Sequence, residues 1–311
     1  MNSPRQIHIR AYAKINLTLE VLHKRPDRYH ELRSVVQTVN LADEIALRPN
    51  TPGTMLRVSG YPVPGGDDNL VMAAIRQVSS RLGVSRDLEL VLRKVIPPGR
   101  GLGGGSSDAA AVLRALGCLH DWQIDRGTLD SIAAELGSDV PLFLKGGTML
   151  MSGRGETVQR LAGPEPEFGL VLTWPKVSVP TEAAYGLLKP EDFTGGETTA
   201  RLWEGLQRGE APRPEGLVNC FERAVFAQWP EVRALHEYLS KLVGASARMT
   251  GSGSAVYALT DQAEAIAEKL RGQGYEAHAV QPVPCAQELS CSPVEGSLAA
   301  GCTLREEPED V

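Results

Sequence analysis

The chain has 311 residues, 42% of them hydrophobic and 23% charged, which is enough for about two domains that bury their own cores. Its formal net charge of −6 argues against a general nucleic-acid binder, which needs a basic face to displace counterions. No apolar run approaches the roughly 20 residues that span a bilayer, and no signal-peptide core follows the N-terminus, so we expect no membrane partner and a cytoplasmic location.

The N-terminal segment from Ile7 to Val21 alternates apolar and polar residues with a period of two. This pattern predicts a strand with one buried face. Lys14 and Asn16 are two residues apart in the polar half of the pattern. We therefore expect both side chains to project to the same side of the strand.

The remaining elements are predicted from the same two periodicities and from turn residues at their ends. In chain order they are a turn at 24–28, a strand over 35–47, loops and hairpins over 49–66, a helix over 69–82, a strand over 88–95, helices over 109–116 and 129–136, a strand at 169–173, a helix over 231–242, a strand over 255–259, a helix over 262–271 and a strand at 276–280. The stretch 190–216 is polar.

Domain boundaries are indicated by changes in composition. The segment Gly-Pro-Glu-Pro at 163–166 is a plausible linker, which predicts domains at 1–162 and 163–283. From residue 284 onward the sequence loses its periodicity and becomes acidic. We therefore expect residues 284–311 to form a flexible tail.

A glycine-rich loop between a predicted strand and a predicted helix is the strongest functional signal. It consists of Pro97, Pro98, Gly99, Arg100, Gly101, Leu102, Gly103, Gly104, Gly105, Ser106 and Ser107. Glycines let the backbone approach a ligand closely, and the helix start offers free N–H groups and a positive dipole end, which suit phosphate. The alternative is a flexible surface loop with serine N-caps. The clean amphipathic helix directly after the loop favours a phosphate site.

Two well-known phosphate loops fit this segment poorly. A Walker A loop has lysine before its serine or threonine, whereas Ser-Ser-Asp stands at 106–108. A formal Gly-x-Gly-x-x-Gly match exists at 99–104, but the prolines at 97 and 98 break the tight strand-to-turn junction of a dinucleotide-binding fold.

Three ordered motifs resemble those of the GHMP kinases, the galactokinase, homoserine, mevalonate and phosphomevalonate kinases. They are Ala-Lys-Ile-Asn-Leu at 13–17, the glycine-rich loop at 97–107 and Arg-Met-Thr-Gly-Ser-Gly-Ser-Ala at 248–255. The resemblance implies a two-domain α+β fold, with an ATP-binding N-terminal domain like ribosomal protein S5 domain 2 and a ferredoxin-like C-terminal substrate domain. The active site would lie in the cleft between them, with ATP and Mg²⁺ as cofactors.

Further segments resemble a branch of the family that acts on a cytidine diphosphate-linked sugar alcohol. They are Asp-Arg-Tyr-His at 27–30, Gly-Ser-Asp-Val-Pro at 137–141 and Val-Ser-Val-Pro-Thr at 177–181, followed by Tyr185. Arg28 departs from the pattern, which usually has glycine there, so we expect a differently shaped turn before Tyr29. A mevalonate- or homoserine-type kinase and a non-catalytic nucleotide-binding regulator are the alternatives; the presence of both Lys14 and Asp139 argues against the regulator.

The resemblance also implies roles for individual residues. Asp139 would orient or deprotonate the acceptor hydroxyl, and Lys14 would keep Asp139 ionised and stabilise the transferred charge. From the residues alone, an ordinary carboxylate at a helix N-terminus is an equal alternative for Asp139. The implied substrate-binding residues are Asn16, Tyr29, His30, Asp139, Thr181, Tyr185, Gly251, Ser252 and Gly253.

Within that set, Tyr29 and Tyr185 would sandwich the cytosine ring and His30 would bind its polar edge. Asn69 is expected near the adenine of ATP, and Ser107 is the candidate hydroxyl ligand of magnesium; no carboxylate ligand can be assigned. Packing tyrosines, a loop histidine and a structural turn at 250–254 are the alternatives.

Overall fold

The computed structural model describes residues 5–49, 53–83, 87–119, 124–285 and 287–293. Its strands are β1 (Arg5–Asn16), β2 (Thr18–Lys24), β3 (His30–Pro49), β4 (Met55–Gly60), β5 (Leu88–Lys94), β6 (Thr148–Gly153), β7 (Thr157–Arg160), β8 (Leu170–Trp174), β9 (Val218–Asn219), β10 (Arg248–Met249), β11 (Val256–Leu259), β12 (Glu276–Val280) and β13 (Gln287–Pro293). Its helices are α1 (Leu70–Leu82), α2 (Gly104–Leu119), α3 (Arg126–Leu136), α4 (Val140–Lys145), α5 (Thr181–Gly186), α6 (Glu197–Gln207), α7 (Glu222–Gln228), α8 (Pro230–Val243) and α9 (Ala263–Gly272), with single 3-10 turns η1 (Pro190–Asp192) and η2 (Pro214–Gly216).

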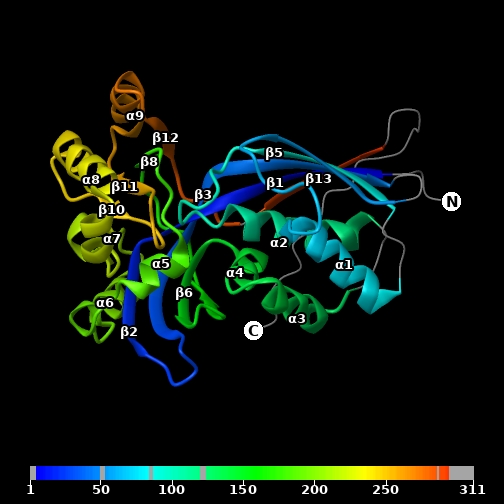
Figure 1. The fold of residues 1–311 in the computed structure, drawn as a ribbon, viewed down its shortest axis with the longest axis horizontal. Helices are drawn as coiled ribbons and strands as arrows, with labels where there is room; N and C mark the ends of the chain where they lie inside the picture. Colours follow the sequence, from blue (N-terminus) through cyan, green and yellow to red (C-terminus); the bar gives the residue numbers. More distant parts are fainter. Residues whose placement is uncertain (1–4, 50–52, 84–86, 120–123, 286, 294–311) are drawn as a thin grey trace.

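The long strand β3 organises the larger sheet. Its first part pairs with β2 and β6, and its second part pairs with β1 and β5, all antiparallel. Strand β4 then adds to β5 in parallel, and β7 adds to β6. Helices α1 to α4 lie together on one face of this sheet, as Figure 1 shows. Because β3 continues past both groups of strands, it ties the α-covered region to the β2 region.

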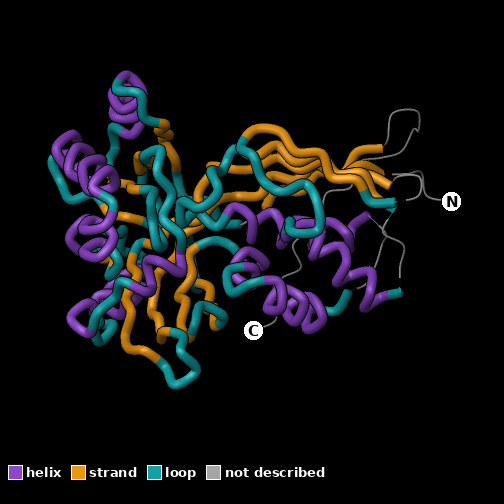
Figure 2. Tube along the Cα trace, in the orientation of Figure 1, coloured by secondary structure: helices purple, strands orange, loops and turns teal. Residues whose placement is uncertain are grey.

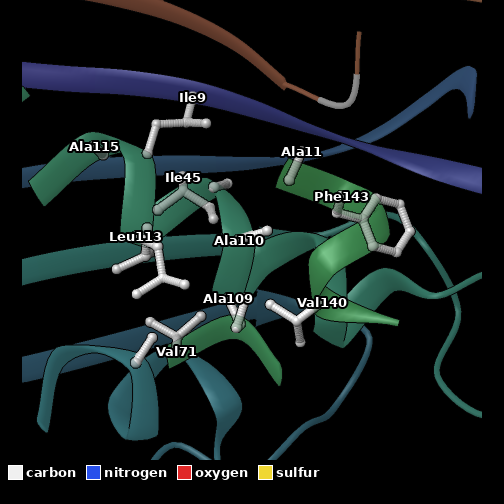
Figure 3. Close-up of a cluster of buried hydrophobic side chains, with 14 of the residues drawn as sticks. Ile9, Ala11, Ile45, Val71, Ala109, Ala110, Leu113, Ala115, Val140 and Phe143 are labelled. Carbon is white, nitrogen blue, oxygen red and sulfur yellow. The ribbon is translucent and has the colours of Figure 1, made fainter. Parts of the chain in front are cut away.

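The first core fills the space between the larger sheet and its helices. It brings together Ile9 and Ile45 of the sheet, Val71 of α1, Leu113 of α2 and Phe143 of α4, all fully buried (Figure 3). Each such side chain contributes roughly 1.5–3 kcal/mol through burial. The core fixes α2, whose first turn carries the glycine-rich loop.

The second sheet has the order β10-β11-β8-β12 and is antiparallel throughout. Helices α7, α8 and α9 pack on its outer side, so that Figure 2 shows a second group of helices at the opposite end of the molecule. A third apolar cluster, including Ile15, Leu102, Leu172 and Tyr257, joins this sheet to the N-terminal strands. The boundary at 162/163 stays a prediction.

The N-terminal segment is strand as predicted, but only its first part, with His8 and Arg10, has an exposed polar side. The strand is interrupted at Leu17 between β1 and β2, and Lys14, Asn16, Thr18 and Glu20 are all buried. These polar side chains are covered because other parts of the chain fold against them and satisfy their hydrogen bonds. The prediction of a single buried face was therefore wrong for residues 12–20, where both sides of the strand are buried.

Further differences concern elements outside the predicted ranges. Part of the expected tail, residues 287–293, forms β13, which pairs antiparallel with β1 through backbone hydrogen bonds that need no apolar pattern; residues 294–311 lie outside the described part. Strand β4 lies in the expected loops, and α6 lies in the polar stretch with only a few buried residues, such as Trp203. Among the described residues, no helix has the length and apolarity needed to cross a membrane.

Candidate active site

The first glycine loop (residues 97–107) connects β5 to α2, and α2 begins inside the motif at Gly104. A Cβ atom on Gly103 would lie 2.7 Å from the Phe143 ring and 3.2 Å from Lys14 Cγ, so only glycine fits between them. The backbone N–H of Lys14 donates to the Leu102 carbonyl (3.0 Å). The loop is therefore held directly against the strand that carries Lys14.

Lys14 and Asp139, far apart in sequence, meet beside this loop. Lys14 Nζ lies 4.0 Å from Asp139 Oδ2 and donates to Asn16 Oδ1 at 2.7 Å. Lys14 is buried, whereas Asp139 keeps a third of its side chain exposed. Burial lowers the pKa of Lys14, and the nearby Asp139 charge acts in the opposite direction. The pair thus presents an accessible carboxylate backed by a buried amine.

Asp139 does not cap its helix. It stands at the N-cap position of α4, yet its side chain makes no capping hydrogen bond. By contrast, Asp125 at the start of α3 accepts from Thr128 N at 2.9 Å. An ordinary helix-capping carboxylate would behave like Asp125. The geometry therefore favours a functional role for Asp139.

The second glycine loop (residues 250–254) closes over the same place. Gly251 N donates to Asn16 Oδ1 (3.0 Å), and Asn16 N donates to Thr250 Oγ1 (2.9 Å). The hydroxyl groups of Ser252 and Thr181 lie 3.1 Å apart. The structure thus brings four predicted substrate residues, Asn16, Thr181, Gly251 and Ser252, to one side of the Lys14–Asp139 pair.

Each aromatic residue predicted to bind the base contacts another side chain. The rings of His30 and Tyr185 stack with centroids 5.2 Å apart, and the guanidinium of Arg154 lies 4.8 Å from the Tyr29 ring centroid. Tyr29 is more than half exposed. Burial is the larger of the two effects that lower the pKa of His30, followed by the charge of Lys24. His30 therefore favours the neutral imidazole, which can both donate and accept hydrogen bonds.

Arg28 adopts a backbone conformation that normally belongs to glycine. Its φ is 70°, in the left-handed region, and its N–H donates to the Arg25 carbonyl at 3.1 Å. The following residue, Tyr29, donates its N–H to Asp27 Oδ1. The conformation costs a side-chain-bearing residue roughly 1–2 kcal/mol. The turn therefore keeps a glycine-type backbone at Arg28 despite the side chain.

Two residues predicted to contact ATP or magnesium are hydrogen-bonded within the protein. Asn69 caps α1, accepting from Val71 N (2.9 Å) and donating to the Pro64 carbonyl (2.7 Å). The fully buried Ser107 hydroxyl donates to the Tyr12 carbonyl (2.7 Å). Ser107 thus points into the protein, which does not favour a role as a magnesium ligand.

Arg100 links the first glycine loop to the C-terminal region. Its Nη1 donates to Ser254 Oγ (2.9 Å) and its Nη2 to the Lys176 carbonyl (2.7 Å). Its side chain is thus engaged by protein groups, and the contact with ATP predicted for this residue would involve its backbone. Through these bonds the two glycine loops are held together.

A buried charge cluster beneath the first glycine loop is absent from the sequence predictions. Lys94 Nζ donates to Asp43 Oδ2 and to Asp108 Oδ2 (2.7 Å), while Asp43 Oδ1 accepts from the backbone N–H groups of Val95 and Ile96. All three charged side chains are nearly inaccessible to solvent. The cluster ties the strand that precedes the loop to the helix that follows it.

Removing the Lys94 charge is expected to destabilise the fold. Lys94→Met would leave two carboxylates buried without a cation, which costs about 3–5 kcal/mol of unfolding free energy. Urea denaturation of the variant and the wild type measures this difference. Lys176→Met, at an exposed site, is the control. Equal midpoints for the two variants would contradict the importance of the cluster.

Known proteins resemble this chain over most of its length. The family model described as "GHMP kinases N terminal domain" matches residues 69–147, and "GHMP kinases C terminal" matches 205–276. Two relatives are named 4-diphosphocytidyl-2-C-methyl-D-erythritol kinase. The Gloeobacter violaceus protein is 38% identical, and the match covers 86% of this chain and 91% of that protein. The Pelotomaculum thermopropionicum protein is 40% identical, and the match covers 84% of this chain and 92% of that protein.

Solved structures agree with these relatives. A crystal structure of 4-(cytidine 5'-diphospho)-2C-methyl-D-erythritol kinase is 35% identical, covers 89% of this chain and 99% of its own, and superposes with a TM-score of 0.75. A homoserine kinase from Cytophaga hutchinsonii is 19% identical, covers 91% and 97%, and has a TM-score of 0.67. The second match shows the shared fold alone.

Proposed function

The chain belongs to the GHMP kinase family, a family of small-molecule kinases, and on that premise we propose that it uses ATP to phosphorylate the 2-hydroxyl of 4-diphosphocytidyl-2-C-methyl-D-erythritol. This reaction would belong to non-mevalonate isoprenoid precursor biosynthesis. The observation that carries the proposal is the Lys14–Asp139 pair, 4.0 Å apart beside the first glycine loop. The cytoplasmic location remains a prediction.

The chemistry assigned to this pair is a single displacement. The hydroxyl oxygen attacks the γ-phosphorus of ATP while the bond to the bridging oxygen breaks and ADP leaves. Asp139 orients the hydroxyl and accepts its proton, and the buried Lys14 offsets the negative charge that gathers on the transferred group. Phosphates would be held by the backbone N–H groups of residues 97–107 and the start of α2.

The described part of the site offers few candidate protein ligands for magnesium. Among the described residues no three His, Cys, Asp or Glu side chains gather into a metal site, and Ser107 is already bonded to Tyr12. Magnesium commonly keeps several waters and binds through substrate phosphates plus one or two carboxylates. We therefore expect the ion to enter with ATP, where it neutralises phosphate charge.

The substrate is assigned to the side where the second glycine loop and the aromatic residues lie. Tyr185 and His30 offer stacked rings, and Tyr29 an exposed ring, for contact with a pyrimidine base. Base stacking suits flat uncharged rings and needs no net positive surface. Asn16, Thr181 and the second glycine loop would then face the sugar alcohol.

A coupled assay of ADP release tests this proposal. The purified protein is given MgATP with 4-diphosphocytidyl-2-C-methyl-D-erythritol, mevalonate or homoserine in separate reactions. Turnover of the cytidyl substrate alone is expected. Turnover only of another alcohol would reject the substrate but keep the kinase. Nucleotide binding without any turnover would favour a regulator on the same fold.

The pH dependence of kcat reports on Lys14. Burial lowers its pKa below the ordinary lysine value of about 10.4, and the charged form is the one that stabilises the transferred group. Activity is therefore expected at pH values where the amine is protonated and lost as pH rises through the lowered pKa. Profiles of kcat between pH 6 and pH 10 measure this limb. In the Lys14→Arg variant the side chain stays charged over that pH range. The fall of kcat at high pH should therefore be absent from its profile, even if the variant is much slower.

A further inference from the structure

The side chain of Asn219 binds backbone groups in two places, at the second glycine loop and just before α7. It lies in β9, buried beneath that loop. Its Nδ2 donates to the carbonyls of Met249 (2.7 Å) and Gly251 (2.9 Å), and its Oδ1 accepts from Phe221 N (2.9 Å). None of the family motifs quoted above contains this residue.

A second side chain from the same segment completes the attachment. Glu222, the first residue of α7, accepts from Met249 N at 2.8 Å through Oε1. Asn219 and Glu222 thus bind the N–H and C=O groups of one residue, Met249, just before the loop. Backbone groups buried here without such partners would each cost about 1–3 kcal/mol. These bonds therefore fix the position of the second glycine loop relative to β9 and α7.

Gly251 connects Asn219 to the Lys14–Asp139 pair. Its carbonyl accepts from Asn219, and its N–H donates to Asn16 Oδ1 at 3.0 Å. The same Asn16 oxygen accepts from Lys14 Nζ at 2.7 Å. A continuous series of hydrogen bonds therefore runs from Asn219 through Gly251 and Asn16 to the amine that lies 4.0 Å from Asp139.

We propose that Asn219 is a positioning residue for phosphoryl transfer, fixing Lys14 relative to Asp139 through Gly251 and Asn16. The proposal rests on the proposed function, because it assigns Lys14 and Asp139 the roles given above. Asn16 Oδ1 accepts from Lys14 Nζ, from Gly251 N and, at 3.4 Å, from the Thr250 hydroxyl, so a shift of residues 250 and 251 changes the place at which that oxygen meets Lys14. Misplacing a reacting group by about 1 Å can cost on the order of 100-fold in rate.

Asn219→Asp is the sharpest test, since it keeps the shape and the oxygen that accepts from Phe221 N. It replaces the two-hydrogen donor by an oxygen that faces the carbonyls of Met249 and Gly251. We expect kcat to fall about 30-fold or more, while KM for ATP stays within about threefold, because the Leu102 carbonyl of the first glycine loop keeps its bond to the Lys14 N–H. A purely structural role would lower stability without this split between kcat and KM.

Thr173→Val is the matched control. Thr173 is fully buried in β8, and its hydroxyl donates to the Glu276 carbonyl (2.7 Å), away from the loop. The Thr173→Val variant should have a lower Tm than the wild type and a kcat within about twofold of the wild-type value. If Asn219→Asp is insoluble, Asn219→Ser removes the two donors without adding a charge, and the same loss of kcat is expected.

Asn219 variants that keep kcat, or lose it only in proportion to a lowered Tm, would overturn the proposal. The assay uses whichever alcohol the wild-type protein turns over. A different substrate would therefore reject the proposed function without affecting the test of Asn219. Conversely, an active wild type with unaffected Asn219 variants rejects only this inference.

Discussion

Replacing Asp139 with asparagine is expected to lower kcat by about 10³-fold and to leave ATP binding nearly unchanged. The amide keeps the size of the carboxylate but cannot accept the hydroxyl proton, and general-base groups typically contribute 10²- to 10⁴-fold. It also removes the negative charge beside Lys14, 4.0 Å away. Single-turnover kinetics and calorimetric titration with an ATP analogue separate the two effects.

Asp125→Asn is a suitable control for this experiment. Asp125 also stands at a helix start, but it caps α3 and lies at an exposed site. Because asparagine is an equally good N-cap, the control should retain both stability and rate. A rate for Asp139→Asn within tenfold of the control would show that Asp139 only helps to place the hydroxyl, and that another group takes the proton.

The elements that the sequence predicted, and the family motifs, have signals that are local. The apolar period predicted over 69–82 corresponds to α1 (Leu70–Leu82), which in the structure has Asn69 as N-cap and Gly83 as a left-handed C-cap. The meeting of Lys14 with Asp139 was expected only through the family resemblance. No local pattern carries the information that these two segments fold against each other.

What escaped prediction depends on tertiary contacts. Lys94, Asp43 and Asp108 read as ordinary charged residues, yet they form a buried cluster because three separate elements meet under the first glycine loop. Asn219 lies in a two-residue strand too short to show any period. Strand β13 is stabilised by backbone pairing with an existing edge, which any side-chain sequence can supply.

Gly101→Ala is the second substitution with a large expected effect. A Cβ at this position would lie 2.2 Å from the Thr250 carbonyl oxygen, and on the other side a Cβ on Gly251 would lie 2.8 Å from Gly101 Cα. The two glycine loops therefore touch through their backbones, and added atoms must force them apart. We expect kcat/KM to fall about 100-fold or more, because the phosphates and the acceptor hydroxyl would no longer be held at reacting distance.

Gly99→Ala separates this contact from backbone strain. Gly99 and Gly101 have nearly the same left-handed φ, 68° and 77°, so both variants pay a similar conformational cost of roughly 1–2 kcal/mol. A Cβ on Gly99, however, meets only Ser178 Cβ at an ordinary 3.5 Å. Steady-state kinetics and Tm of both variants measure the difference. Equal losses would mean that the glycines serve the loop's conformation alone; a much larger loss at Gly101 would mean that catalysis requires the two loops to stay in contact.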